Sequence, residues 1–237
     1  MMKLRRLLYS VELRLSRLPL SSAVSDRLKM RHRRFDEAFR TGAWTDTGES
    51  ASGDGSSLAA TEKLRAALPR AIEELAVKTL LDVPCGDWNW MSQVDLPLEQ
   101  YIGGDIVSPL IRQNQERFSD PRRTFLLIDL CIDELPAADL LLCRDAFIHF
   151  SYTDIWRAIA NVKDAGITYI ATTTFPATET NTDQLTGIPW RPINLEAAPF
   201  SFPQPFMKIS DHFNRPDQIL AFWQVSDLPD VSTQARF

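Results

Sequence analysis

The sequence has few cysteines, no long apolar run and few glycines for its length. Its three cysteines, Cys85, Cys131 and Cys143, are scattered through 237 residues. Their spacing fits neither a disulfide framework nor a zinc site, so we expect reduced thiols, a cytoplasmic protein and no bound metal. No stretch approaches the roughly 20 apolar residues of a transmembrane helix, and the N-terminus lacks the pattern of a secretory signal peptide.

Basic residues are scarce outside the first 34 positions. Residues 1–34 contain ten Lys or Arg and two acidic residues, whereas the remaining chain contains 16 basic and 29 acidic residues. An acidic main domain repels a phosphate backbone, which argues against nucleic acid as a partner. A length of 237 residues with 44% hydrophobic content is enough for one sizeable domain and an appendage.

The appendage is a basic amphipathic arm over residues 1–40. Within residues 3–18, leucines recur at helical spacing and basic side chains occupy the other faces. One interpretation is a helix that packs on the domain or on a second subunit. The other is contact of residues 1–34 with an anionic membrane, which would place the protein peripherally at the inner membrane.

Residues 41–57 are rich in glycine and serine and contain four of the nine glycines. Such a composition is typical of a linker. Trp44 is unusual in a plain linker, however, and a loop of small residues just before the first domain helix can fold over a ligand. We therefore interpret residues 41–57 as a lid, followed by the main domain over residues 58–237.

Short apolar runs alternate with helical patterns along the main domain. The runs predict strands over residues 79–83, 101–106, 124–129, 139–143 and 168–174, with helices over 57–78, 88–94 and 108–118. Residues 205–209 and 218–226 predict two closing strands, the last of them antiparallel. This alternation indicates an α/β fold, a doubly wound and mostly parallel sheet with helices on both faces.

Acidic residues recur at the ends of the predicted strands. Asp82, Asp105, Asp129 and Asp145 each lie at or just past a strand end. Ligands of parallel α/β sheets bind at the carboxyl ends of the strands. Asp105, about 20 residues past Gly86, is suited to accept hydrogen bonds from ribose hydroxyls.

Residues 82–91, Asp-Val-Pro-Cys-Gly-Asp-Trp-Asn-Trp-Met, are the most specific stretch. They resemble the Asp-x-Pro-Cys-Gly-Asp-x-Asn-Trp-Met signature of a group of small bacterial class I S-adenosylmethionine-dependent methyltransferases. The resemblance extends over roughly residues 40–226. It implies a seven-strand sheet and S-adenosylmethionine as the methyl donor, bound by Asp82, Pro84, Cys85, Gly86, Asp87, Asp105, Ile106, Asp129, Leu130, Cys143 and Arg144.

Asp145 and His149 are the catalytic candidates. If residues 145–149 form a helical turn, the two side chains lie four apart on one face. The carboxylate would then favour the protonated imidazole and orient it as a general base for an attacking hydroxyl. The alternative is a structural histidine, with Arg144 and Asp145 as a local ion pair.

Residues 189–206 hold five prolines and four aromatics, which excludes regular helix. We expect an extended loop across the pocket, with Trp190, Arg191 and Asn194, together with Trp44, contacting the acceptor. The alternative is a covering loop that shields an edge strand.

These patterns predict a methyltransferase that acts on a small-molecule or glycan acceptor, most simply by O-methylation. One alternative is a non-catalytic binding module with the same fold. A nicotinamide-dependent dehydrogenase is disfavoured because the turn after the first strand has only Gly86 where that fingerprint has three glycines.

Overall fold

The computed structural model describes residues 22–44, 48–211 and 215–231 of the chain. The helix predicted over residues 3–18, and the membrane contact proposed with it, lie outside these ranges. Within them, no helix combines the length and the apolarity that crossing a membrane requires.

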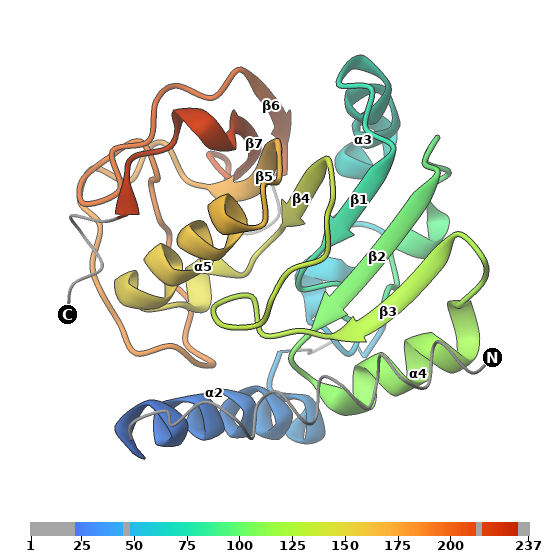
Figure 1. The fold of residues 1–237 in the computed structure, drawn as a ribbon, viewed down its shortest axis with the longest axis horizontal. Helices are drawn as coiled ribbons and strands as arrows, with labels where there is room; N and C mark the ends of the chain where they lie inside the picture. Colours follow the sequence, from blue (N-terminus) through green and yellow to red (C-terminus); the bar gives the residue numbers. More distant parts are fainter. Residues whose placement is uncertain (1–21, 45–47, 212–214, 232–237) are drawn as a thin grey trace.

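Seven strands form one sheet (Figure 1), in the order β3-β2-β1-β4-β5-β7-β6. Strands β1 to β5 are parallel, and β7 is antiparallel to both of its neighbours. This confirms the predicted sheet and its antiparallel last strand. The strands are β1 (Thr79–Asp82), β2 (Gln100–Asp105), β3 (Arg123–Leu127), β4 (Leu140–Cys143), β5 (Tyr169–Thr174), β6 (Met207–Ser210) and β7 (Ile219–Gln224).

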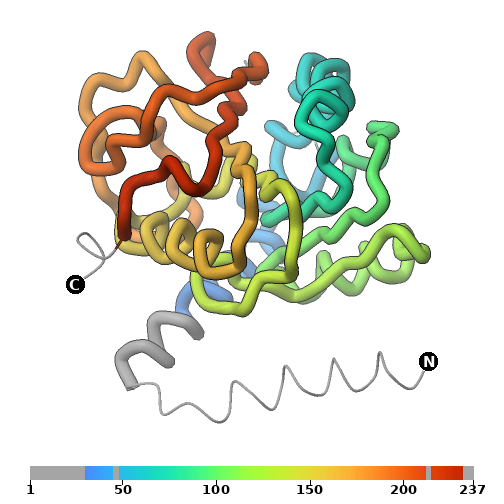
Figure 2. Tube along the Cα trace, turned by 45° about the horizontal axis from the view of Figure 1, so that its top comes forward, coloured from blue at the N-terminus to red at the C-terminus, as the bar shows by residue number. Residues whose placement is uncertain are grey.

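Both faces of the sheet are covered by apolar side chains. In β1, Leu80 packs with helix α3 (Glu62–Glu74) on one face, and Leu81 packs with helix α5 (Tyr152–Asp164) on the other. Successive side chains of a strand point to opposite faces, so a strand covered on both sides is apolar throughout. The β6 side of the sheet (orange and red) and the β3 side (green) lie on opposite sides of the molecule in Figure 2.

Two helix predictions need correction. No α-helix follows β1: residues 88–94 form only the short 3₁₀ helix η2 (Met91–Gln93), because Trp88 has a left-handed φ of 58° that interrupts helical geometry. The helix predicted over 57–78 is shorter, since α3 spans Glu62–Glu74, and it continues through Pro69 instead of dividing there. Helix α4 (Ser108–Phe118) matches its prediction and packs against β2 and β3.

Helix α2 (Ser22–Thr41) was not distinguished from the rest of the basic arm in the sequence. It lies across the end of the sheet toward which β1, β2 and β3 point (Figure 1). Phe35 and Ala38 are buried, and so is the side chain of Arg31. The second half of the arm is therefore a wall of the folded domain.

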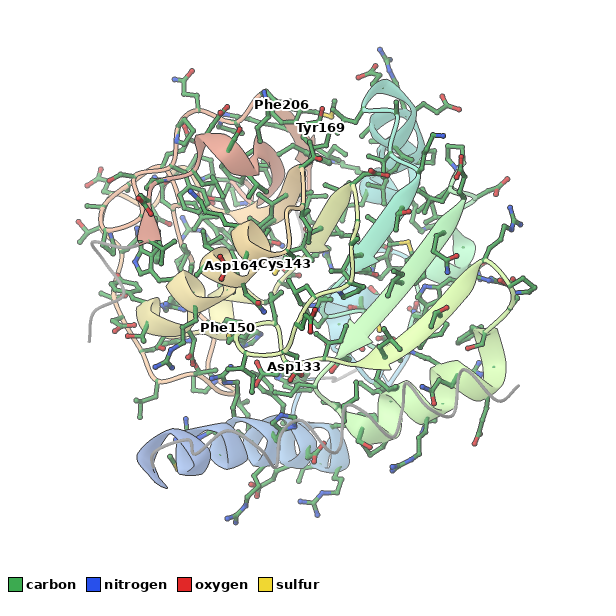
Figure 3. All side chains as sticks on the ribbon, viewed as in Figure 1. Asp133, Cys143, Phe150, Asp164, Tyr169 and Phe206 are labelled. Carbon is green, nitrogen blue, oxygen red and sulfur yellow. The ribbon has the colours of Figure 1, made fainter. Side chains whose placement is uncertain are left out.

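The two ends of the sheet differ in character. At one end, the rings of Tyr169 and Phe206 pack at 5.8 Å between centroids (Figure 3). Phe150 and Asp133 lie at the opposite end, near α2. That second end, where the parallel strands finish, contains the candidate site.

Candidate functional site

A cavity of about 560 Å³ opens at the carboxyl ends of β1, β2 and β4. This volume lies within the roughly 300–1,000 Å³ of small-molecule sites. The cavity is lined by Arg31 and Phe35 of α2, by Ala43, Trp44 and residues 52–56, by residues 82–87 and Trp90, by residues 105–107 and Leu110, by residues 128–130, by residues 144–146 and 148–150, and by Ile188 and Trp190.

Most of the residues predicted from the sequence meet at this cavity. Its lining includes Asp82, Pro84, Cys85, Gly86, Asp87, Asp105, Ile106, Asp129, Leu130, Arg144, Asp145, His149, Trp44 and Trp190. Cys143, Arg191 and Asn194 are not part of the lining. Cys143 is a buried core residue of β4.

The turn after β1 is held by Asp105. The amide of Gly86 donates to Asp105 Oδ2 at 3.0 Å, and the amide of Val107 donates to Oδ1 at 2.9 Å. Gly86 has a φ of +55°, and a Cβ there would lie 2.2 Å from Ser52 Oγ. Glycine is therefore required by both the backbone conformation and the close approach of Ser52.

Asp87 fastens the glycine- and serine-rich segment onto this turn. Its carboxylate accepts hydrogen bonds from Ser50 Oγ at 3.0 Å and from the amide of Ala51 at 2.7 Å. The amide of Asp87 donates to Ser52 Oγ at 2.8 Å. The segment thus lies beside the cavity, where the lid interpretation requires it to be, and residues 52–56 contribute to the lining.

Asp82 and Asp105 are buried acids in the cavity wall. Burial raises the pKa of Asp82 to about 7, against the hydrogen bond that the Tyr101 hydroxyl donates to it. Burial likewise raises the pKa of Asp105 to about 6, against the hydrogen bonds from the Val107 and Gly86 amides. Both acids therefore begin to bind protons near neutral pH.

The two carboxylate oxygens of Asp129 differ in their hydrogen bonding. Arg31 Nη1 donates to Oδ1 at 2.7 Å, and the Cys131 amide donates to the same oxygen at 3.0 Å. Oδ2 is buried and has no hydrogen-bond partner in the described part of the chain, although His32 Nε2 lies 3.8 Å away. A buried acceptor without a donor is uncommon, and an amino group of a bound molecule would satisfy it.

Arg144 and Asp145 belong to a buried polar cluster. Arg144 donates through Nε and Nη2 to Asp211, at 2.9 Å each, and its Nη1 lies 3.3 Å from Asp145 Oδ2. Asp145 Oδ1 accepts from Thr173 Oγ1 and Gln218 Nε2. Burial raises the pKa of Asp211 to about 6, against the attraction of Arg144. Sequence reasoning did not identify Asp211 or Gln218 as partners in this cluster.

The predicted pairing of Asp145 with His149 is not the geometry observed. Asp145 has a φ of +52°, and the 3₁₀ helix η3 begins only at Phe147. The hydrogen bonds described for the Asp145 carboxylate go to Thr173 and Gln218, while His149 Nδ1 lies 3.3 Å from the Pro189 carbonyl oxygen. Burial lowers the pKa of His149, against the attraction of Asp145, so the neutral imidazole is favoured instead of the protonated form.

Arg191 and Asn194 build the loop beside the cavity. Arg191 donates to the carbonyl oxygens of Phe147, Ile148 and Thr182 at 2.8–3.1 Å. Asn194 Nδ2 donates to the carbonyl oxygens of Pro176 and Thr178. Trp190 of this loop lines the cavity, whereas the side chains of Arg191 and Asn194 hold the loop backbone in place.

Sequence reasoning missed the contribution of α2. Arg31 and Phe35 line the cavity, and Arg31 also donates to Asp154 Oδ1 at 3.2 Å. Arg31, Phe35 and Ala38 recur at helical spacing, which is the signal that was available.

No protein-family model matches the chain, and no curated protein matches it in sequence. Among solved structures, it is similar to the 1,6-didemethyltoxoflavin-N1-methyltransferase of Burkholderia thailandensis with bound 1,6-didemethyltoxoflavin and S-adenosylhomocysteine, with a TM-score of 0.56 and 15% identity over 87% of this chain and 92% of that chain. It is also similar to the N-methyltransferase NodS of Bradyrhizobium japonicum in complex with S-adenosylhomocysteine, with a TM-score of 0.55 and 11% identity over 83% of this chain and all (100%) of that chain. The chain therefore has the fold of the class I S-adenosylmethionine-dependent methyltransferases.

Proposed function

We propose that this protein is an S-adenosylmethionine-dependent methyltransferase with a small-molecule acceptor. The observation that carries the proposal is the cavity wall at β2 and β3, which combines the buried acid Asp105 with Asp129, whose buried Oδ2 has no hydrogen-bond partner among the described residues. An acid at the end of β2 suits the ribose hydroxyls of a nucleoside. The unpartnered Asp129 Oδ2 suits the amino group of adenine.

The residues present fit the cofactor. Asp105 would hold the ribose, Asp129 the adenine amino group, and Ile106 and Leu130 would flank the base. The turn at Gly86 would receive the methionine portion. When bound, S-adenosylmethionine supplies a methyl group activated by a positively charged sulfur.

His149 is the proposed general base. Its Nδ1 faces the Pro189 carbonyl oxygen, which can only accept, so Nδ1 carries the hydrogen and Nε2 keeps a lone pair. Burial favours this neutral form. With the cofactor bound as the methyl donor and S-adenosylhomocysteine as its leaving form, His149 Nε2 would accept the proton that the acceptor hydroxyl loses on methylation. We accordingly propose O-methylation.

Calorimetric titration of the full chain with S-adenosylhomocysteine tests the cofactor assignment, with NAD⁺ as the matched control. We expect micromolar binding of S-adenosylhomocysteine and no binding of NAD⁺. Binding of NAD⁺ alone would support the dehydrogenase alternative, and binding of neither would refute the assignment. Cofactor binding without turnover on any acceptor would favour the binding module.

Once an acceptor is known, substitution His149→Ala tests whether His149 acts as the general base. Loss of a general base typically lowers turnover by about 10²- to 10⁴-fold, and we expect S-adenosylhomocysteine affinity to be unchanged. Turnover close to that of the parent would remove His149 from the mechanism. The dependence of turnover on pH adds an independent readout. The fall in parent turnover at low pH, where His149 becomes protonated, should be absent from the variant.

The cytoplasmic location and the peripheral membrane contact of residues 1–34 stay as predictions from the sequence. Flotation of the full chain with anionic vesicles, compared with a chain lacking residues 1–21, tests them. Equal flotation of both proteins would contradict a membrane role for residues 1–21. The shorter chain keeps all of α2 and hence the cavity wall.

A further inference from the structure

The loop over residues 184–191 carries its polar side chains inward. Gln184 Nε2 donates to the carbonyl oxygens of Ile148 at 3.0 Å and Pro189 at 2.8 Å. Thr186 Oγ1 donates to Asp154 Oδ2 at 2.6 Å. Together with the three carbonyl contacts of Arg191, these bonds fix the loop backbone against η3 (Phe147–His149) and α5.

The apolar side chains of the same loop point outward. Leu185 is 76% exposed, Trp190 45% and Ile188 37%. Trp190 stacks on the buried ring of Phe175 at 6.3 Å between centroids with an interplanar angle of 29°, so one of its faces is supported. Ile188 and Trp190 also line the cavity. A rigid apolar rim of this kind is typical of a surface that binds an apolar group.

The facing part of the cavity is aromatic as well. Trp44 lies with its ring centroid 6.4 Å from that of His149 and 6.0 Å from that of Phe35. His149 in turn touches the loop through the Pro189 carbonyl oxygen. The proposed base therefore contacts both Trp44 and the loop that carries Trp190.

The charges and hydrogen bonds around the cavity restrict the chemical class of the acceptor further. Among the described residues that line the cavity, the two arginines are already paired: Arg31 with Asp129 and Asp154, and Arg144 with Asp145 and Asp211. An anionic acceptor would thus find no unpaired arginine among these residues, while Asp82, Asp87 and Asp105 also line the cavity. A glycan needs polar side chains around an aromatic platform, and Gln184 and Arg191 are turned away onto the backbone.

We propose that the acceptor is an uncharged aromatic compound bearing the hydroxyl group, with its ring held between Trp44 and Trp190 beside His149. This rests on the proposed methyltransferase function and names its substrate class. Aromatic rings prefer offset or edge-to-face packing against tryptophan, which adds to the burial of their surface. The remaining apolar part of the acceptor lies against Ile188 at the rim.

The test is a fragment screen by saturation-transfer NMR on the full chain, with and without saturating S-adenosylhomocysteine. The set contains neutral aryl alcohols such as 2-naphthol, the corresponding aryl phosphates, and methyl glycosides. We expect hits among the aryl alcohols and not among the other two classes. Preferential binding of glycosides or phosphates, or the absence of any aryl alcohol hit, would overturn the inference.

Three variants locate the binding of 2-naphthol or the best aryl alcohol. Trp190→Ala should weaken it about tenfold through lost stacking and burial, and Trp190→Phe should recover most of that loss. Leu185→Ala is the matched control, since Leu185 belongs to the same loop outside the cavity lining. Equal affinity of Trp190→Ala and the parent would contradict the proposed position.

Cofactor binding keeps the two proposals distinguishable. All three variants should bind S-adenosylhomocysteine as the parent does. If S-adenosylhomocysteine binds and aryl alcohols do not, the acceptor inference alone fails. If S-adenosylhomocysteine does not bind the parent, the proposed function fails whatever the fragments do.

Discussion

The four acids at the strand ends form two contrasting pairs. Asp82 and Asp105 are hydrogen-bonded by neutral groups, a tyrosine hydroxyl in one case and backbone amides in the other. Asp129 and Asp145 instead contact arginines, Arg31 and Arg144. The same residue type at equivalent topological positions thus acts in two ways. Asp105 holds the turn at the cavity and Asp82 joins β1 to Tyr101 of β2, whereas the second pair fastens α2 and the segment after β6 to the sheet.

The largest expected effect comes from removing Arg31, which pairs with Asp129. Substitution Arg31→Met leaves Asp129 buried without its cation, and loss of one partner of a buried ion pair costs about 3–5 kcal/mol. We expect the free energy of unfolding, measured by urea denaturation, to fall by about that amount. The matched control is Arg157→Met, because Arg157 is partly exposed and its partner Asp154 keeps its contact with Arg31, so its loss should cost less than about 1 kcal/mol. Similar losses of unfolding free energy in Arg31→Met and Arg157→Met would contradict the expected difference between the two arginines.

A change of pH tests the first pair. Because the pKa of Asp82 is about 7 in the folded protein and 3.8 in the unfolded chain, the folded state holds more protons between these values. Stability contributed by this group is therefore present at low pH and is lost as pH rises toward 7. We expect Asp82 to account for a decrease of about 3 kcal/mol in unfolding free energy between pH 5 and pH 8.

The measurement compares urea denaturation of the parent and of Asp82→Asn across that range. The variant cannot lose a proton at this position, so its curve should be flatter. Tyr101, Asp105 and Arg144 influence the same carboxyl and are kept in both proteins. Parallel curves for the two proteins would show that Asp82 does not titrate in this range.

Substitution Asp105→Ala tests whether Asp105, a member of the first pair, contributes to binding the cofactor. It removes the acceptor for the Gly86 and Val107 amides and the proposed ribose contact. We expect S-adenosylhomocysteine affinity, measured by calorimetry, to fall by about 100-fold. The matched control is Asp139→Ala, since Asp139 also accepts two backbone amide bonds but precedes β4 at the opposite end of the sheet. An unchanged affinity in Asp105→Ala would place the cofactor elsewhere.

The smallest effect is expected at Tyr101. Substitution Tyr101→Phe removes the hydroxyl that donates to Asp82, which should cost about 1 kcal/mol and raise the pKa of Asp82 further. In the denaturation series above, the pH dependence should move to higher pH. Tyr152→Phe is the control, because that hydroxyl is buried without a hydrogen-bond partner in the described ranges. A larger loss from Tyr152→Phe would contradict the role of the Tyr101 hydroxyl.

Local patterns predicted most of the sheet and much of the cavity. Apolar runs closed by acids placed β1 to β5 within about two residues, because buried parallel strands are apolar on both faces. The same logic brought Asp82, Asp105 and Asp129 to one cavity. These acids meet because each one ends or follows a parallel strand, and the carboxyl ends of parallel strands lie at one edge of the sheet. The alternation of strands and helices in the sequence is what indicates parallel strands.

Long-range partners were not predictable in this way. Arg31 and Asp129 lie 98 positions apart, and Arg144 and Asp211 lie 67 apart. Nothing in the local sequence distinguishes a buried arginine from a solvated one. Arg191 shows the converse error: a polar residue in an apolar loop was assigned to the acceptor, but it holds three carbonyl oxygens of its surroundings. Helix prediction failed after β1 because the left-handed Trp88 is not visible in residue type.

The contact between Gly86 and Ser52 limits how this protein can be altered. A methyl group at position 86 would overlap both Oγ and Cβ of Ser52, which approach its ideal position to 2.2 and 2.9 Å. Ser52→Gly would remove this overlap but not the left-handed φ of +55°, which strains any other side chain at position 86. Directed evolution of this region should therefore keep Gly86 whatever residue occupies position 52, 34 residues earlier in the sequence.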